Sequence, residues 1–537
     1  MPGPVTLEIE RKLQLPDPAR TREWLNSPEL PGYTVTAAGE VLQHDVYLDT
    51  EDWRTYRWGY ACRIRRSGRR SELILKSFGE ESRVRERTEI AQSLPRSYRP
   101  GSPLPADGAV GEKLSSIAGS SRLRPLFYLD TRRRKFLAQT PGGPRVEIAF
   151  DDCRLRPAGS RRSQAFNEIE VELLGPGSSE SVDRVADLLV QALGAEDEGR
   201  TKFGRGLAAA GLDPEAYQQF GPATFDADTP AREAVAALLR KQAQRMLREE
   251  AATRLGEDLE ALHDMRVAVR RARTFLRIYG GVLPAARVAA VSGELRWLGD
   301  ALGGVRDIDV QLEGFAADPE VFSPGAEARA LVRAHLEEVR HKKRNLLLAA
   351  LDSARYRRLV RSLRTLLRPV SRMTGAQREP AGTYLPAVAY ELLGKVVKRG
   401  KRLDATSPTS ELHRLRIKAK RARYALESAS PLLGKPARKV IPEVVRVQDH
   451  LGALQDAVVR GDLLRRFAVT LPTTIERQII LDLGGLIAAN DLQLLSLKER
   501  FPSVFRRFAG YPDLKQLMKN LGSAFEARTA GARPLSP

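Results

Sequence analysis

Short stretches that alternate charged and apolar residues fill the first 212 positions, and clusters of Gly, Pro and Ser separate them. Alternation with a period of two is the pattern of a β-strand, because successive side chains point to opposite faces of a sheet. Many short strands with turn signals between them predict an antiparallel sheet or barrel. The expected strands are 8–12, 41–49, 61–66, 72–76, 83–91, 135–139, 145–150 and 167–174, with helices at 18–26 and 181–193.

From residue 231 to residue 525 the apolar positions recur with helical spacing, in a composition rich in Ala, Leu, Arg and Glu. Between the two regions, Leu212-Asp213-Pro214 and the loop-like segment 220–230 predict a linker. We therefore expect a multi-domain α and β protein. Its parts are a β region over 1–212, a linker over 213–230, an all-α region over 231–525 and a disordered tail over 526–537.

The helical region contains an internal repeat. An L-H-x-x-R motif begins at Leu262 and again at Leu412, and each copy is followed by an L-G-x-x-(R/Q)-D motif, beginning at Leu302 and Leu451. The spacing from the His to the Asp is 44 residues in the first copy and 43 in the second. Two motifs at matched spacing predict a duplicated helical bundle, with pseudo-repeats at about 231–370 and 380–525.

Each L-H-x-x-R motif continues as a cationic stripe along one side of its helix, within a sector of roughly 80°. The stripes consist of His263, Arg266, Arg270 and Arg273 in the first copy and of His413, Arg416, Lys420 and Arg423 in the second. No acid lies within either stripe, so the cations repel one another unless an anion lies across them. We favour anion binding over an ordinary solvated face. Asp307 and Asp456 either orient stripe residues by salt bridges or serve helix packing.

The net charge of +21 indicates anionic partners. Residues 1–212 hold 33 Lys and Arg against 30 Asp and Glu, whereas residues 213–537 hold 55 against 37, so the helical region carries most of the excess. Few aromatic residues accompany these cations, which argues against stacking on single-stranded nucleic acid, although duplex binding through phosphates stays open. A specific nucleic-acid partner is not expected.

Two cysteines are too few for a disulfide framework or a thiolate metal site. The sequence has no apolar run near 18 residues and no signal-peptide pattern, so we expect a cytoplasmic protein without a membrane partner.

The candidate chemistry of the β region lies in its carboxylates. Glu8, Glu10 and Lys12 share one face of the opening strand, and Glu168, Glu170 and Glu172 share one face of the last. Polar positions on a half-exposed strand ordinarily face water. Three carboxylates in a row nevertheless repel one another unless cations compensate them, and the same region supplies such cations at Arg63, Arg65, Lys76 and Lys202. A closed barrel with a charged interior would accommodate all of these residues.

The ordered motifs of residues 5–210 resemble the CYTH family, the triphosphate tunnel metalloenzymes. They are E-x-E-x-K at Glu8, Y-L-D-T at Tyr47, R-I-R at Arg63, L-K at Leu75, R-T-E at Arg87, E-x-E-x-E at Glu168 and T-K at Thr201. The resemblance implies an eight-stranded antiparallel tunnel that binds a triphosphate with one or two Mg²⁺ or Mn²⁺ ions.

The CYTH resemblance also implies roles for individual residues. Glu8, Glu10 and Lys12 would be catalytic, and the metal ligands would be Glu8, Glu10, Glu89, Asp151, Glu168 and Glu170, with Glu172 sharing that role. The phosphoryl groups would contact Arg63, Arg65, Lys76, Lys202 and one of the consecutive Arg132, Arg133 and Arg134, for which we choose Arg133.

The helical region resembles the CHAD family, the conserved-histidine α-helical domains, over residues 231–520. That resemblance implies two pseudo-symmetric bundles facing a basic cleft that binds inorganic polyphosphate, with phosphate contacts from all eight stripe residues. Gln455 stands where the first copy has Arg306, so the two halves need not be equivalent.

Together these features predict a metal-dependent hydrolase of inorganic triphosphate or a related triphosphate, whose helical domain binds polyphosphate. Hydrolysis of a phosphoanhydride requires charge neutralisation and in-line positioning of water, for which these residue types are suited. The alternatives are a non-catalytic protein associated with polyphosphate granules, and a thiamine triphosphatase or adenylate cyclase that uses the same tunnel. Inorganic triphosphate ranks first because the sequence has no recognisable base-binding element.

Overall fold

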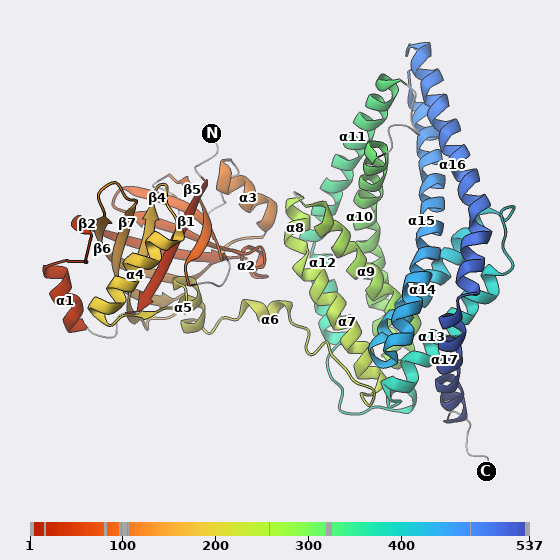
Figure 1. Cartoon of the computed structure of the whole chain (residues 1–537), viewed down its shortest axis with the longest axis horizontal. Helices are drawn as coiled ribbons and strands as arrows, with labels where there is room; N and C mark the ends of the chain where they lie inside the picture. Colours follow the sequence, from red (N-terminus) through yellow and green to blue (C-terminus); the bar gives the residue numbers. More distant parts are fainter. Residues whose placement is uncertain are drawn as a thin grey trace. The chain divides into compact units, whose positions relative to one another are not determined.

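The computed structural model describes the chain except for residues 1–4, 15–17, 80–82, 96–97, 99–104, 106, 120, 257, 318–324, 473 and 532–537. The chain divides into two compact units, Met1–Gln218 and Gln219–Pro537 (Figure 1). The first unit contains the β-strands, and the second is built from α-helices and short 3₁₀ turns.

The first unit is a closed antiparallel barrel. The strands run in the order β5-β4-β3-β2-β6-β7-β8-β1, and pairing of β1 with β5 closes the ring, while the short β9 pairs with β1 outside it. This confirms the predicted eight-stranded barrel. The strands are β1 Val5–Gln14, β2 Thr34–Asp49, β3 Tyr60–Ser67, β4 Arg70–Ser77, β5 Arg85–Ser93, β6 Arg124–Gln139, β7 Arg145–Pro157, β8 Gln164–Leu174 and β9 Glu196–Asp197.

Short helices surround the barrel. They are α1 Pro18–Asn26, α2 Arg54–Arg57, α3 Ala109–Ala118, α4 Ser179–Leu193, α5 Lys202–Ala209 and α6 Pro214–Gln218. Helix α4 packs Val182, Val185 and Leu189 against the outward apolar residues of the barrel strands, including Ile169 and Val171 of β8. Burial of each such side chain stabilises the fold by about 1.5–3 kcal/mol. The outer faces of these strands are thus part of an apolar core, and their charged alternate residues point into the barrel.

Three strands, β2, β6 and β7, are much longer than the sequence predicted. β2 and β6 each have 16 residues and pair along most of their length. In β6 the consecutive Arg132, Arg133, Arg134 and Lys135 conceal the alternation, because both faces carry cations there. A β-bulge between Ala37 and Gly39 interrupts the pairing of β2, which hides its period in the same way.

The second unit is built from helices joined by loops in its described residues, as predicted. Its helices are α7 Ala231–Arg248, α8 Glu250–Leu255, α9 Leu259–Tyr279, α10 Ala285–Ala317, α11 Ala326–Asp352, α12 Ala354–Leu366, α13 Ala381–Gly400, α14 Thr409–Leu433, α15 Lys435–Thr470, α16 Arg477–Ala509 and α17 Pro512–Gly531, with 3₁₀ turns at Gly280–Val282 and Gly375–Gln377. The two cationic stripes lie on α9 and α14, which contact each other. The equivalent motifs therefore meet within one unit.

The segments predicted as linker and as tail differ in part from the expectation. Helix α6 forms inside the segment predicted as a linker, and α17 continues to Gly531 where the disordered tail was expected from Glu526. Arg528 there donates to Glu379 at 3.1 Å. Residues 532–537 lie outside the described residues.

By length and composition, α16 is apolar enough to cross a membrane, with a mean hydropathy of 1.3 over an 18-residue window, but one such helix is weak support for a membrane span.

Candidate functional site

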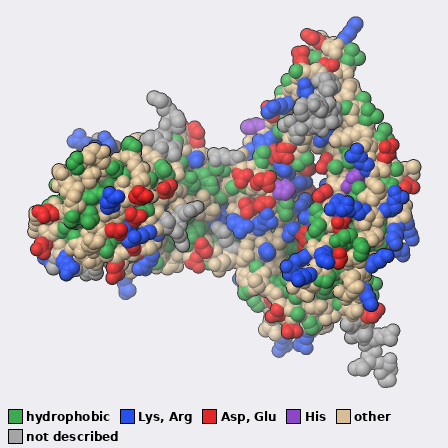
Figure 2. Space-filling model, viewed as in Figure 1, with side chains coloured by type: hydrophobic (Ala, Val, Ile, Leu, Met, Phe, Trp, Pro, Cys, Tyr) green, Lys and Arg blue, Asp and Glu red, His purple; other side chains and the backbone are tan. Residues whose placement is uncertain are grey.

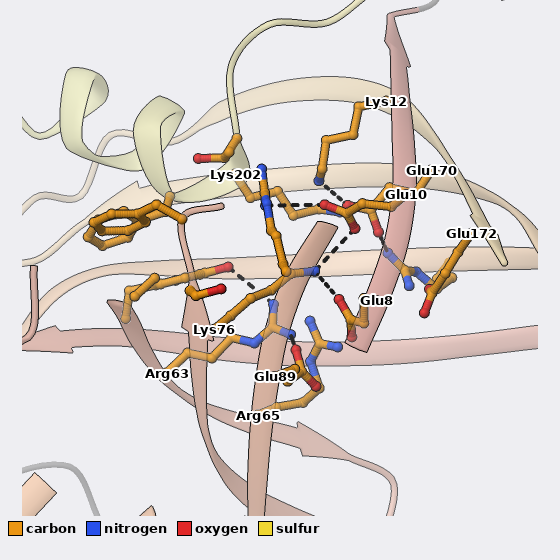
Figure 3. A pocket seen from close by; sticks show the side chains of 18 residues that line it. Glu8, Glu10, Lys12, Arg63, Arg65, Lys76, Glu89, Glu170, Glu172 and Lys202 are labelled. Atoms are coloured by element: carbon orange, nitrogen blue, oxygen red, sulfur yellow. Dashed lines mark hydrogen bonds and ion pairs between the residues drawn. The ribbon is translucent and has the colours of Figure 1, made fainter. Parts of the chain in front are cut away.

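The inner face of β1 carries the opening motif. Glu8, Glu10 and Lys12 point into the barrel, where they line one cavity (Figure 3). The outward Arg11 is instead buried against Asp183 and Asp187 of α4 at 3.0 and 2.7 Å. The predicted alternation of faces is thus present, and the outward charge has its own acidic partners.

Three carboxylates gather on the wall formed by β7 and β8. Asp151, Glu168 and Glu170 are buried, and each offers an oxygen within 4.8 Å of the others. Lys202, the first residue of α5, contacts all three at 2.6 to 2.9 Å. Thr201 fixes the start of that helix, because its hydroxyl accepts a hydrogen bond from the Gly204 N–H at 3.0 Å.

Two more cations complete this cluster. Arg133 donates to both oxygens of Asp151 at 2.8 and 2.6 Å and also contacts Glu170. Lys12 contacts Glu170 and lies 3.3 Å from Glu168. Arg133 is therefore the arginine of its run that faces the tunnel, whereas Arg132 and Arg134 on either side are 60% and 37% exposed.

The opposite wall pairs further charges. Lys76 contacts Glu8 and lies 3.1 Å from Glu10. Arg63 contacts Glu89 at 3.0 Å, and Arg65 donates to both oxygens of a buried carboxylate at 2.9 and 2.7 Å. Every predicted tunnel residue except Asp151 and Glu168 lines the cavity itself, and those two stand directly behind Lys202.

Several residues of the site were missed by the sequence reasoning. Arg87 is buried, lines the cavity and lies 3.1 Å from Glu10, and its Nε and Nη2 have no hydrogen-bond partner among the described residues. Its place two residues before Glu89 on the same strand face was the available signal. The carboxylate that holds Arg65 is Asp45, and no motif pointed to it.

Aromatic rings form one end of the same cavity. Tyr47, Phe78 and Phe203 line it, and the rings of Phe78 and Phe203 stack with their centres 5.8 Å apart. Tyr47 stacks on Phe127 at 4.6 Å. This aromatic wall was not predicted, because its members come from three separate segments of the chain.

The paired charges shift the titration of two glutamates in opposite directions. Burial alone would raise the pKa of Glu10, but Lys76 and Lys12 together lower it to about 2. Burial raises the pKa of Glu172 to about 7, and the nearby Glu8 adds to this shift. Glu10 is therefore ionised at neutral pH, whereas Glu172 exchanges its proton near pH 7.

The carboxylate cluster fits a hard divalent cation. Its donors are all oxygens, the set that Mg²⁺ and Mn²⁺ prefer. Glu168 is fully buried, yet its Oε2 has no hydrogen-bond partner in the described part of the chain. A buried oxygen without a partner is costly unless a ligand satisfies it. Asp151, Glu168 and Glu170 are thus the residues of this barrel best placed to hold a metal.

In the helical unit the two cationic stripes face one another. Burial lowers the pKa of Arg416, and its nearby charges are Asp456, Arg270 and Arg266, the last two from the other repeat. Arg266 is paired with Asp307 at 2.8 Å, which favours the orienting role for that acid. Figure 2 shows Lys, Arg and His side chains gathered on the visible face of this unit.

A cavity of about 480 Å³ opens between α9, α10 and α14. Its cationic lining comprises Arg270, Arg273, Arg277, Arg296, Lys420 and Arg421. Arg277, Arg296 and Arg421 were not among the predicted contacts. Arg277 and Arg296 lie outside the repeated motif, and Arg421 lies within it but was not assigned to the stripe. Burial lowers the pKa of Lys420 to about 7, and Arg416 and Arg270 add to the effect.

The sequence predicted that the stripes are free of acids, and this is wrong. Arg423 is held within its own helix by Glu427 at 2.7 Å, and Arg273 lies 4.0 Å from Asp300 of α10. Asp300 belongs to a neighbouring helix, so spacing along α9 could not reveal it.

The two histidines also differ between the repeats. In the second repeat, the Nδ1 of His413 lies 2.6 Å from the side-chain oxygen of Gln455. In the first repeat, burial lowers the pKa of His263, and the nearby Arg306 lowers it further.

Two family models match this chain in succession. The CYTH domain model matches residues 6–198 and the CHAD domain model matches residues 237–465. An uncharacterized protein of Mycobacterium tuberculosis is 26% identical over 501 residues, which cover 88% of this chain and 90% of that protein.

Solved structures resemble each half. The CHAD domain from the plant Ricinus communis is 27% identical and covers 54% of this chain and 96% of that one, with a TM-score of 0.44. An adenylyl cyclase candidate from Hippeastrum with a dominant triphosphatase activity is 20% identical and covers 38% of this chain and 97% of that one, with a TM-score of 0.25. Both family resemblances read from the sequence are confirmed by the family models.

Proposed function

We propose, for a chain that has a CYTH domain followed by a CHAD domain, that the barrel hydrolyses inorganic triphosphate in a metal-dependent reaction. The observation that carries this proposal is a single cavity in which cations alternate with buried carboxylates. The cations are Lys12, Arg63, Arg65, Lys76, Arg87, Arg133 and Lys202. A ligand that matches them must be a compact polyanion, because each phosphoryl group can accept several of these charged donors.

The residues divide into those that hold phosphate and those that hold metal. Arg63, Arg87 and Arg133 offer planar guanidinium groups for paired contacts with phosphoryl oxygens, and Lys76 supplies a movable point charge. Asp151, Glu168 and Glu170 would hold Mg²⁺ or Mn²⁺, and Glu8, Glu10 and Glu89 are further candidate ligands from the other wall. When bound, such an ion neutralises phosphoryl charge and orients the substrate.

Water activation is assigned to the β1 carboxylates and to Glu172 of β8. Glu10 stays ionised at neutral pH and accepts hydrogen bonds from the attacking water, with Glu8 beside it. Glu172, whose pKa is about 7, is the carboxyl most able to take a proton from that water near neutral pH. Removal of a positioned acid or base ordinarily costs about 10²–10⁴-fold in rate.

Inorganic triphosphate is preferred over nucleoside or thiamine triphosphate. The cavity is narrow, with about 80 Å³ of open space, and its lining is mostly charged. The rings at its aromatic end stack on one another, so a planar organic group would have to displace Phe78 from Phe203 or Tyr47 from Phe127.

For the helical unit we propose binding of inorganic polyphosphate. The supporting observation is that Arg266, Arg270 and Arg416 from the two repeats lie close enough to perturb one another. A chain of phosphates across both stripes would relieve this repulsion. The remaining proposed contacts are His263, Arg273, His413, Lys420 and Arg423. Location in the cytoplasm and association with polyphosphate granules follow from the same proposal.

The test is phosphate release from tripolyphosphate, ATP, thiamine triphosphate and long-chain polyphosphate, measured side by side with Mg²⁺ and with Mn²⁺. Tripolyphosphate should be the best substrate. Asp151→Asn should lose activity, while the control Asp152→Asn, on the exposed face of the same strand, should keep it. Preference for ATP or thiamine triphosphate would overturn the substrate assignment, and no release from any of the four would overturn the enzymatic one.

A further inference from the structure

Helix α16 has two apolar faces, of which only one is covered. Ile479, Leu483 and Leu486 are buried, together with Asn490, whose side-chain amide donates to the Ala457 carbonyl of α15 at 3.0 Å. These positions, spaced by three and four residues, form the face that packs on α15. In Figure 1, α16 lies along the outer edge of the helical unit, with α15 on its inner side.

The opposite face of α16 carries a second apolar stripe. Leu481, Leu492 and Leu495 are 69%, 67% and 55% exposed, and Gly484 and Ala488 between them are exposed as well. At about 100° per residue these five positions fall within roughly 80° of one another and lie on the side of the helix away from the buried face. Exposed leucines in one continuous stripe, in contrast to scattered ones, mark an interaction surface.

The order of residues in the stripe fits a second copy of itself. In an antiparallel pair centred on Ala488, residue 481 of one helix meets residue 495 of the other, so leucine faces leucine at both ends. Leu492 meets Gly484, where a Cβ added to the glycine would meet no other part of the chain within 4 Å, so the position is open to an approaching side chain. Ala488 meets its own copy, and the small residue at the centre allows the two backbones to come close.

The charges at the ends of the stripe complement one another in the same arrangement. Arg477 of one helix meets Glu499 of the other, and the two-fold axis repeats this pair at the opposite end. A membrane surface would require neither the small central residues nor an acidic end, and cationic flanks would suit it better. A two-fold symmetric pair uses every one of these features, since residues away from the axis contact different residues of the same patch and Ala488 on the axis contacts its own copy.

We propose that the exposed face of α16, from Arg477 to Glu499, is the interface of a homodimer in which two α16 helices pack antiparallel about Ala488. The partner is a second copy of this chain, and the surface lies on the side of α16 opposite to its contacts with α15. The proposal is independent of the tunnel chemistry, because none of its residues lines the barrel cavity or the cationic cavity.

The oligomeric state of the full chain tests this interface. Sedimentation equilibrium should give the mass of two chains at roughly 100 µM, a concentration at which a dimer with a micromolar Kd is nearly complete. Ala488→Glu places two carboxylates against each other at the axis and should give one chain. The control Val469→Glu introduces the same charge at a position of α15 that is 87% exposed, and it should leave the dimer intact. Circular dichroism of both variants shows whether the helices are retained.

Disulfide trapping tests the direction of packing. Ala488→Cys should cross-link to its own copy on oxidation, whereas Leu481→Cys alone should not, because its two copies would lie roughly 20 Å apart. A mixture of Leu481→Cys and Leu495→Cys should cross-link. The native Cys62 and Cys153 are buried, and the unmodified protein serves as the blank.

Four outcomes would overturn the proposal. They are a monomer at 100 µM, equal disruption by Ala488→Glu and Val469→Glu, ready cross-linking of Leu481→Cys alone, and a monomer that binds anionic vesicles through Leu481 and Leu492. The last result would assign the face to a membrane surface.

Discussion

Arg133 offers the sharpest test of the charged barrel interior, because its neighbour Arg134 is a matched control on the opposite face of β6. Arg133 is buried and pairs with Asp151 and Glu170, whereas Arg134 is 37% exposed and pairs with an exposed aspartate at 3.2 Å. Arg133→Met leaves two buried carboxylates with less compensation, and breaking such a pair costs about 3–5 kcal/mol. Arg134→Met should cost at most about 1 kcal/mol.

The loss of stability in Arg133→Met should depend on pH, and the pKa values of the two carboxylates determine the direction. Neighbouring cations hold the pKa of Asp151 and of Glu170 below their ordinary values, against the effect of burial. Groups with depressed pKa values contribute stability above their unfolded pKa, near 4, and lose it as the pH falls through the folded pKa. The penalty of Arg133→Met should therefore be full at pH 7 and smaller at pH 5, where the carboxylates of the variant begin to take up protons.

Thermal unfolding measures the effect. For a unit of this size, about 3–5 kcal/mol corresponds to a fall in Tm of roughly 6–20 °C. Three of the four tryptophans lie in the barrel, so a Trp297→Phe background makes the fluorescence report on that unit. Equal Tm values for Arg133→Met and Arg134→Met at pH 7 would refute the account of the barrel interior. A loss of stability in Arg133→Met that grows as the pH falls would show that the ionised carboxylates are not its cause.

Three further predictions concern the proposed ligands. Polyphosphate binding should weaken as the pH rises from 6 to 9, because Lys420, with a pKa of about 7, loses its proton. In a fluorescence titration, Lys420→Arg should remove most of this pH dependence. An unchanged slope would exclude Lys420 as the titrating group. Arg416→Glu, a charge reversal at a half-buried position, should weaken polyphosphate binding about tenfold or more. Arg414→Glu, at an exposed position, should change it little. Equal effects would place the anion elsewhere. In a thermal shift assay, Mg²⁺ should raise the Tm of the wild type and of Asp152→Asn but not that of Asp151→Asn. A shift in all three proteins would contradict a metal site at Asp151, Glu168 and Glu170.

The period-two alternation was enough to place the main walls of the barrel. Lys12 and Glu170 could be assigned to one interior because each stands in a clear run of alternating residues on its own strand. The family resemblance implied one tunnel arginine among Arg132, Arg133 and Arg134 but did not determine which, since three consecutive arginines have no period. The structure settles it by the register that places Arg133 opposite Asp151.

What the sequence could not provide were contacts between elements far apart in the chain. Asp45 holds Arg65 across two strands, and the aromatic end of the cavity joins Tyr47, Phe78 and Phe203. The pairing of Arg423 with Glu427 is a different case, because an acid at i+4 on the same helix is visible in the sequence and was overlooked.

The most direct test of the central claim is the rate of phosphate release from tripolyphosphate by wild type and by Glu10→Ala, with Mg²⁺ or Mn²⁺ present. Glu86→Ala on the outer face of β5 is the control. The account predicts activity in the wild type and in the control, and a loss of about 10²-fold or more in Glu10→Ala. A wild type that releases no phosphate, or a Glu10→Ala variant that matches it, would contradict the proposed triphosphatase.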